Sequence, residues 1–207
     1  MLRSLVPLAA LLAFCCLSQG AAAQSSDLDN VVSQLRGGGY VIVLRHGSTN
    51  RDQADTDPLN LENVARQRHL SDAGREQARQ LGDAFRKLGI PLGSVYTSRF
   101  QRAIDTGKLI SGSEVTPTAD VSEGGLVVTP IENDRRAEAL RKLASTPPAA
   151  GKNTLVVTHK PNILDAFGRD WFDVREGEAS IFRPDPSGKP ALLARVQAAD
   201  WIKAAAR

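Results

Sequence analysis

Two unbroken hydrophobic stretches dominate the pattern of apolar and polar positions along the chain. Residues 40–44 (Tyr-Val-Ile-Val-Leu) and 154–158 (Thr-Leu-Val-Val-Thr) contain no charged side chain. Such runs predict strands that are buried on both faces, as in a parallel sheet. The first run leads into Arg45-His46-Gly47 and the second into His159. Because ligands of open α/β sheets bind beyond the carboxyl ends of strands, both histidines are expected at a binding site.

The rest of the pattern alternates helical stripes with shorter strands. Helices are predicted over residues 26–37, 71–88, 99–110 and 129–143 and from Pro161 onward, and strands near 94–97, 114–118, 180–183 and 191–196. Ser71 suits the N-cap of the second helix, and the Thr129-Pro130 pair suits the start of the fourth. This alternation predicts an α/β fold, a three-layer sandwich with a mainly parallel central sheet.

The long polar segment at residues 48–69 follows the first buried strand directly. It is rich in Asp, Asn and Arg and shows no sustained hydrophobic period. A loop of this length in a compact domain is more often functional than idle. We therefore expect it to border the binding site.

The N-terminal residues differ in kind from the rest. Arg3 precedes an apolar run from Leu5 to Leu17, and Ala21-Ala22-Ala23 stands before Gln24. This pattern is typical of a secretory signal peptide at residues 1–23, which leaves one domain at residues 24–207. The apolar run is short for a bilayer span, so we expect a secreted or periplasmic protein without stable membrane insertion.

The two cysteines, Cys15 and Cys16, both lie in the predicted signal peptide. The mature chain would then have no disulfide and no thiol with which to bind a metal. An alternative is a lipoprotein signal that ends at one of these cysteines, although Phe14 stands before Cys15 where a small residue is typical.

Composition narrows the class of protein further. The 207 residues are 42% hydrophobic and 24% charged, which is typical of a folded domain. Lys and Arg total 26 against 23 Asp and Glu, and this small surplus gives no indication of nucleic-acid binding. No two of His46, His69 and His159 have the spacing of a metal-ligand pair, so neither a metal nor another cofactor is predicted.

Three strand-to-helix junctions carry Arg and His residues, and together they resemble a known family. The matching motifs are residues 45–49 (Arg-His-Gly-Ser-Thr), 70–78 (Leu-Ser-Asp-Ala-Gly-Arg-Glu-Gln-Ala), 98–103 (Ser-Arg-Phe-Gln-Arg-Ala) and 158–159 (Thr-His). In this order they resemble the histidine phosphatase superfamily, which has the phosphoglycerate-mutase-like fold. Lys160 follows the second histidine where the acid phosphatase and phytase branch has aspartate, so the chain looks like a small branch 1 member.

The resemblance implies that His46 attacks phosphorus and forms a phosphohistidine, which water then hydrolyses. It implies that Arg45, Arg102 and, if protonated, His159 bind the phosphoryl oxygens, with Thr49 and Arg99 as further substrate-binding residues. The chemistry agrees, because a guanidinium stays protonated and grips two oxygens at once. A neutral imidazole is in turn a competent nucleophile.

The proton donor for the leaving group is left open by the motifs. Glu123 is the first candidate and Glu132 the second, and a third alternative is that no carboxylate serves. The surrounding sequence departs from the usual acid motif of the family. Asp52 stands where asparagine is common, and Lys160-Pro161-Asn162 replaces the glycine common after the second histidine. These departures bear on the substrate more than on the chemistry.

The pattern as a whole predicts an exported phosphatase that hydrolyses phosphate monoesters. Its substrate would be a phosphorylated small molecule, an envelope sugar phosphate or a phosphoprotein. The alternative is a non-catalytic module that binds phosphate or an anionic glycan in a degenerate phosphatase pocket. Arg66 and Arg68 either form a solvated face or line the entrance to the phosphate site. His69, which precedes the Ser71 cap, either touches substrate or is a capping or solvated residue.

Overall fold

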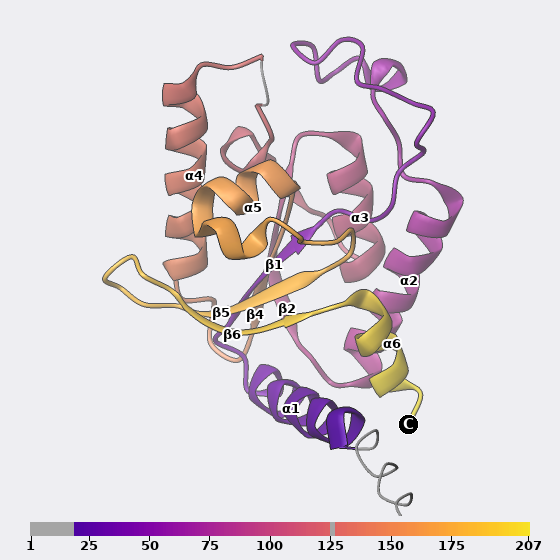
Figure 1. Cartoon of the computed structure of the whole chain (residues 1–207), viewed down its shortest axis with the longest axis vertical. Coiled ribbons are helices and arrows are strands. Elements are labelled where there is room, and N and C mark those ends of the chain that lie inside the picture. Colours follow the sequence, from indigo (N-terminus) through magenta and orange to yellow (C-terminus); the bar gives the residue numbers. More distant parts are fainter. Residues whose placement is uncertain (1–18, 125–126) are drawn as a thin grey trace, which may run out of the picture.

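The computed structural model describes residues 19–124 and 127–207, which form a single sheet with helices on both faces (Figure 1). The strands run in the order β3-β2-β4-β1-β5-β6. The first four strands in this order are mutually parallel. Strand β5 is antiparallel to β1, and β6 is antiparallel to β5, so the sheet is mixed and mainly parallel as predicted. The strand bounds are β1 (Val41–Arg45), β2 (Leu92–Ser98), β3 (Thr116–Thr118), β4 (Asn153–Thr158), β5 (Ala179–Arg183) and β6 (Ala191–Val196).

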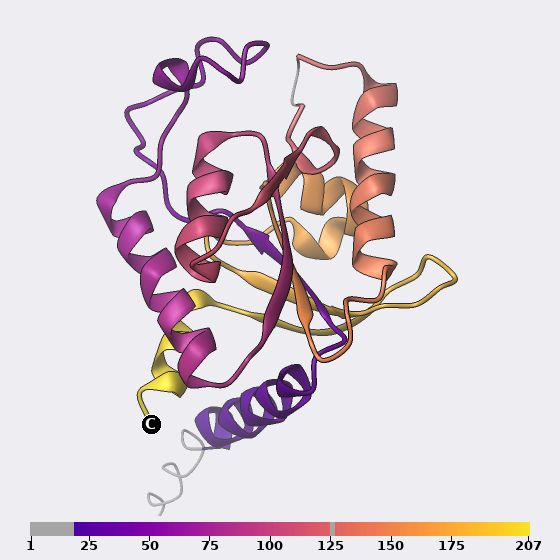
Figure 2. The same cartoon turned by 180° about the vertical axis from the view of Figure 1, so that it is seen from behind.

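The helices form the two outer layers. Helices α2, α3 and α6 lie on one face and α4 and α5 on the other, while α1 lies at the end of the sheet remote from the loop of residues 48–69 (Figures 1 and 2). Their bounds are α1 (Gln19–Arg36), α2 (Asp72–Lys87), α3 (Gln101–Ser111), α4 (Pro130–Ser145), α5 (Lys160–Phe167) and α6 (Ala198–Ala205), with single 3-10 turns at Val64–Arg66, Ala119–Val121 and Arg169–Trp171. The predicted three-layer α/β fold is confirmed.

Strand β1 is covered on both faces, which explains why its sequence is apolar without interruption. Ile42 and Leu44 pack into the core cluster shared with α1, α2, α3 and α6, whereas Val41 and Val43 pack into the cluster shared with α4 and α5. All four side chains are fully buried. Since successive side chains of a strand point to opposite faces, only a strand covered on both faces needs apolar residues at every position.

Two helix starts follow the predicted capping chemistry. The Ser71 hydroxyl accepts a hydrogen bond from the Gly74 N–H at the start of α2, and the Thr129 hydroxyl accepts one from the Glu132 N–H at the start of α4. Each bond satisfies one of the backbone donors left unpaired in a first helical turn. The residues that begin these helices are therefore set by local sequence.

Two helices differ from the expectation. Helix α1 begins at Gln19, seven residues before the predicted cap Ser26, and runs through the predicted cleavage point after Ala23. Helix α6 was not predicted at all. It is held by tertiary packing, because the buried Trp201 ring meets Phe85 of α2 edge-on, with ring centroids 5.2 Å apart.

Most of the predicted signal peptide, including Cys15 and Cys16, lies outside the described residues. Cleavage after Ala23 and the lipoprotein alternative therefore stay predictions from the sequence. In the part of the chain that the structure describes, no helix combines the length and apolar character needed to cross a bilayer.

Candidate active site

The two histidines that follow the buried strands lie side by side. Strands β1 and β4 are parallel neighbours, and Arg45 pairs with Thr158 in their register. His46 therefore follows β1 at the level where His159 follows β4, and the two ring centroids are 5.1 Å apart. The side chains are almost completely buried, with His46 3% exposed and His159 0%. The strand-end argument brings together residues that are more than a hundred positions apart in the chain.

The environment of His46 suits a nucleophile. Its Nδ1 atom lies 2.8 Å from the carbonyl oxygen of Gly47. A carbonyl can only accept, so Nδ1 carries the hydrogen and Nε2 keeps its lone pair. Burial, followed by the charges of His159 and Arg102, holds the pKa of His46 well below its ordinary value. The ring is therefore neutral at pH 7, as attack on phosphorus requires.

His159 is held from its other nitrogen. Its Nε2 atom lies 2.7 Å from the Ser98 hydroxyl at the end of β2. Its Nδ1 atom has no hydrogen-bond partner among the described residues and lies 3.7 Å from Oε2 of Glu123. Burial and then the charges of Arg102 and Arg68 hold the pKa of His159 well below its ordinary value. The ring is therefore neutral at pH 7, and a bound anion would favour its protonated form.

Arg102, on the first turn of α3, is the most deeply buried cation of the cluster, with no exposed surface. Its Nη1 atom donates to Oδ1 of Asp55 at 3.0 Å, and its Nη2 atom donates to Oε1 of Glu123. The guanidinium also lies over the Phe100 ring, 4.2 Å from the ring centroid. Two carboxylates therefore balance the buried charge, which would otherwise be strongly unfavourable.

Arg45, the last residue of β1, is positioned by the segment that precedes β5. Its Nη1 atom donates to the Val174 carbonyl at 2.8 Å, and its Nη2 atom lies 3.5 Å from Oε1 of Glu176. Burial, opposed by Glu176 and reinforced by Arg68, lowers the pKa of Arg45. Its Nε atom is buried and has no hydrogen-bond partner within residues 19–124 and 127–207, so it is available to an anion.

The turn after His46 is packed too tightly for side chains. A Cβ atom added to Gly47 would lie 3.1 Å from the Gly74 carbonyl oxygen, and one added to Gly74 would lie 2.0 Å from the Ser48 carbonyl oxygen. The Gly47 N–H donates to the Thr106 hydroxyl of α3 at 3.1 Å. Gly47 thus allows close approach of this turn to the start of α2.

Glu123 and Glu132, the two candidate proton donors, have different surroundings. Glu123 bonds Arg102 and faces His159, as given above, and its side chain is 23% exposed. Glu132 accepts from Arg135 and Arg136, which lower its pKa to about 2. Among the described residues, Glu132 makes no contact with either histidine. The geometry favours Glu123.

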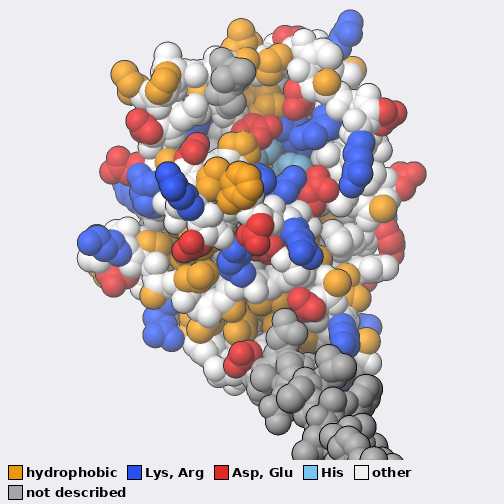
Figure 3. Space-filling model, viewed as in Figure 1, with side chains coloured by type: hydrophobic (Ala, Val, Ile, Leu, Met, Phe, Trp, Pro, Cys, Tyr) orange, Lys and Arg blue, Asp and Glu red, His pale blue; other side chains and the backbone are white. Residues whose placement is uncertain are grey.

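The other substrate-binding candidates are divided between two hollows beside the cluster. Thr49 and Arg68 line a pocket of about 470 Å³ together with Arg45. Arg99 lines a smaller one of about 260 Å³ with Glu123, and its guanidinium is paired with Glu62 at 2.8 Å. In the orientation of Figure 1, the space-filling view shows histidine atoms in a hollow among basic and acidic side chains (Figure 3).

Two further candidates lie in the segment that leads to α2. Arg66 is exposed and His69 is partly exposed. The His69 N–H donates to Oε1 of Gln53 at 3.0 Å, so its backbone braces the loop of residues 48–69. Neither side chain lines the two hollows beside the cluster.

Asp55 and Gln67 are site residues that the sequence did not reveal. Oδ1 of Asp55 accepts from the backbone N–H of Arg68 at 2.9 Å as well as from Arg102. The buried Gln67 side chain accepts from the backbone N–H of Gln101 at 2.7 Å. These bonds hold the loop of residues 48–69 against the start of α3, beside Arg102.

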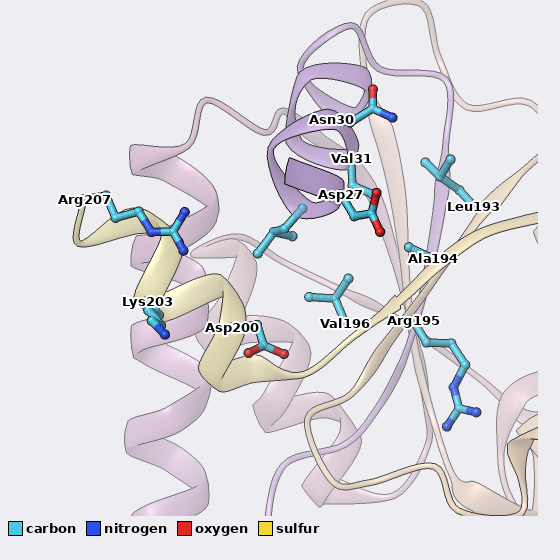
Figure 4. A pocket seen from close by; sticks show the side chains of 11 residues that line it. Asp27, Asn30, Val31, Leu193, Ala194, Arg195, Val196, Asp200, Lys203 and Arg207 are labelled. Carbon is cyan, nitrogen blue, oxygen red and sulfur yellow. The ribbon is translucent and has the colours of Figure 1, made fainter. Parts of the chain in front are cut away.

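A further pocket lies away from these residues. It has a volume of about 530 Å³ and is formed between α1, β6 and α6 (Figure 4). Its lining mixes Val31 and Val196 with charged groups such as Asp27 and Lys203, and it contains no histidine. Within residues 19–124 and 127–207, no group of three or more His, Cys, Asp or Glu side chains is arranged to hold a metal ion.

Comparison with known proteins agrees with this geometry. Residues 41–126 match the sequence model of the Histidine phosphatase superfamily (branch 1). No curated protein matches the chain.

Solved structures with the same fold cover most of the chain. The protein histidine phosphatase SixA, complexed with tungstate, is 18% identical, with a TM-score of 0.55 over 78% of this chain and 98% of its own. A mutant phosphoserine phosphatase from Entamoeba histolytica, in complex with phosphoserine, is 15% identical, with a TM-score of 0.52 over 77% and 97%. YhfR from Bacillus stearothermophilus is 17% identical, with a TM-score of 0.52 over 74% and 94%. At these identities the likeness confirms the phosphoglycerate-mutase-like fold.

Proposed function

Because residues 41–126 match the sequence model of the Histidine phosphatase superfamily (branch 1), we propose that the chain is a member of this family and hydrolyses phosphate monoesters through a phosphohistidine intermediate on His46. One observation carries the proposal: a neutral His46, held by Nδ1, lies against His159 in a cluster that also contains Arg102. A nucleophile and fixed cationic donors around one position are what phosphoryl transfer requires.

The first step forms the phosphohistidine. The lone pair on Nε2 of His46 attacks phosphorus in line with the ester oxygen, and the bond between phosphorus and that oxygen breaks. Glu123 gives its proton to the leaving oxygen. Arg45 and Arg102 bind the equatorial oxygens, whose negative charge is best matched by guanidinium groups that stay protonated throughout.

The second step restores the enzyme. Water attacks phosphorus from the side that the leaving group has vacated, and Glu123 takes a proton from it. The bond between phosphorus and Nε2 then breaks, and inorganic phosphate leaves. The same carboxylate thus serves as acid and then as base, since it occupies the same place in both steps.

The contacts of Arg102 suggest how substrate binding prepares this sequence. In the free chain its Nη1 and Nη2 atoms donate to Asp55 and Glu123. A phosphate dianion that takes these donors releases Glu123, which can then carry the proton for the leaving group. The same dianion beside His159 favours the protonated ring, which becomes a third donor to the phosphoryl oxygens.

The substrate that we propose is a phosphorylated small molecule or envelope sugar phosphate, or alternatively a phosphoprotein. The structural neighbours include phosphatases named for a protein phosphohistidine and for phosphoserine, so the fold accepts both kinds of substrate. Export to the periplasm or the medium rests on the signal-peptide pattern of residues 1–23.

Hydrolysis of p-nitrophenyl phosphate tests the proposal. The wild type should turn over this ester, His46→Ala should be inactive, and His69→Ala should keep the activity. A wild type no faster than His46→Ala would sink the catalytic proposal. If that wild type still bound phosphate, the chain would be a non-catalytic phosphate- or anionic-glycan-binding module.

The role of Glu123 has a separate test. Glu123→Gln should slow hydrolysis of alkyl phosphates far more than that of p-nitrophenyl phosphate, because only poor leaving groups need a proton. Glu132→Gln is the matched control and should leave both rates close to those of the wild type. Equal slowing of both esters by Glu123→Gln would remove Glu123 as the proton donor.

A further inference from the structure

The pocket beside Arg45, with a volume of about 470 Å³, has a lining with a marked excess of positive charge. Besides Arg45 it is lined by four cations, Arg51, Arg68, Lys160 and Arg175, and we call it the cationic pocket. None of these four side chains forms an ion pair with any residue in the described part of the chain.

The acidic residues of the same lining do not balance these charges. Asp173 lies 2.8 Å from Arg195, and Glu176 lies 3.5 Å from Arg45. The hollow on the other side of the cluster is different, because its cations are matched: Arg99 pairs with Glu62 and Arg136 with Glu132. The cationic pocket therefore keeps an uncompensated positive field, which attracts anions.

Three separate segments of the chain supply the four cations. Arg51 and Arg68 come from the two ends of the loop of residues 48–69, and Lys160 is the first residue of α5. Arg175 comes from the connection before β5. A charge run along one segment would be an ordinary solvated face. Convergence of distant segments on one concavity is typical of a binding site.

The cationic pocket adjoins the reacting groups. It shares Arg45 and Thr49 with the candidate active site. The positive charge of Arg68 is close enough to lower the pKa of both His159 and Arg45. At the rim, the ammonium of Lys160 lies over the Phe172 ring, 4.7 Å from the ring centroid, and Phe172 is 70% exposed. This contact holds one cation in place without neutralising it.

We infer that the cationic pocket binds a second anionic group of the substrate, so that the preferred substrates are phosphate monoesters carrying a further phosphate or carboxylate. This inference rests on the proposed function, since it places the scissile phosphate at His46. Anionic groups match the unpaired cations, and guanidinium groups suit both phosphate and carboxylate oxygens.

The test compares alkanediol monophosphates with the corresponding bisphosphates and with phosphoalkanoic acids, over a series of chain lengths. At low ionic strength we expect kcat/KM for the best doubly charged compound to exceed that of its monophosphate by about tenfold, since such an interaction is electrostatic. The preference should shrink as salt is added. The bisphosphate and carboxylate arms show which second group is favoured.

Charge reversal locates the effect. The double variant Lys160→Glu/Arg175→Glu should reduce the ratio of the two kcat/KM values by about tenfold, because exposed pairs each contribute modestly. Lys189→Glu makes a charge change of the same sign in the turn between β5 and β6, beyond the opposite end of β1, and should leave the ratio unchanged. Equal effects of the two variants would overturn the inference.

Failure of the inference is distinguishable from failure of the proposed function. A wild type that hydrolyses monophosphates and doubly charged compounds equally well overturns the cationic pocket alone. If the wild type shows no turnover, calorimetry measures the dissociation constants of the same compounds for His46→Ala, and the monophosphate is compared with the doubly charged ligand. Tighter binding of the doubly charged ligand then supports the pocket, and equal binding refutes it.

Discussion

The buried histidine pair should make folding stability depend on pH in a defined direction. His46 and His159 have pKa values held well below the ordinary value by burial and by neighbouring positive charge. In the unfolded chain each ring returns to a pKa of about 6.5. Below that pH the unfolded state binds protons that the folded state does not. The stabilising contribution is thus complete above about pH 6.5 and is lost as the pH falls.

The size of the loss follows from proton linkage. While both rings stay neutral in the folded chain, protonation of the unfolded chain removes about 1.4 kcal/mol per histidine at pH 5.5. The two histidines together therefore remove about 2.8 kcal/mol, a large part of the 5–15 kcal/mol that is typical of a folded domain. At pH 7.5 their combined effect is only about 0.1 kcal/mol.

Urea unfolding at pH 7.5 and 5.5 measures this loss. His46→Gln/His159→Gln removes both titrating rings, so between these two pH values its free energy of unfolding should fall less than that of the wild type by about 2.7 kcal/mol. His69→Gln controls for removal of an imidazole at a partly exposed position. If the wild type and the double variant lost equal stability between the two pH values, the rings would not be buried and neutral, and the nucleophile argument would fail with them.

A bound dianion should counteract this loss of stability at low pH. Sulfate is tetrahedral and keeps its charge across this pH range, and its negative charge favours protonated imidazoles. At matched ionic strength, sulfate should therefore stabilise the wild type more at pH 5.5 than at pH 7.5. Equal stabilisation at both pH values would show that no histidine faces the bound anion.

Two other substitutions test the packing and the clamp. Gly74→Ala places a Cβ atom 2.0 Å from the Ser48 carbonyl oxygen, so urea unfolding should show a free energy of unfolding lower by about 3 kcal/mol. In the control Gly37→Ala the nearest atom to the new Cβ is 3.4 Å away, and the free energy of unfolding should change little. Equal effects of the two variants would contradict the close packing. Arg102→Lys keeps the charge but loses the planar guanidinium, so kcat/KM for p-nitrophenyl phosphate should fall by about a hundredfold. The same change at the exposed Arg79 should lower kcat/KM by less than about threefold. An equally small loss for Arg102→Lys would show that Arg102 does not bind the phosphoryl oxygens.

Much of the fold was predictable from local pattern. The uninterrupted run of β1 predicted a strand covered on both faces, and Ser71 predicted the start of α2 from its capping hydroxyl. Helix α6 was missed although alanine favours helices, because a segment of eight residues is too short to form a stable helix on its own. What fixes it is the packing of Trp201 on Phe85, a contact between distant segments. Local signals specify elements whose cause is local, and packing specifies the rest.

The same division applies to the site. His46 and His159 were predictable because each ends a buried strand, and neighbouring parallel strands end at the same edge. Asp55 was not, because the loop that carries it has no period and its partner Arg102 lies 47 residues away. Ser98 is the last residue of β2, and the histidines directly follow β1 and β4, so the strand-end argument applied to a third strand would have found it.

The two groups of cations in this molecule are prepared for anions in different ways. Arg102 is buried, and its charge is already balanced by Asp55 and Glu123, so an arriving phosphate exchanges one set of anionic partners for another. Exchange yields little net electrostatic gain, because removing these carboxylates restores the desolvation penalty that they offset. In the described part of the chain, Arg51, Arg68, Lys160 and Arg175 have no ion-pair partner, so an anion there displaces no carboxylate from them. The second charged group of the substrate would then add affinity that the scissile phosphate alone does not supply, and inorganic phosphate, which lacks that group, would leave more readily after each turnover.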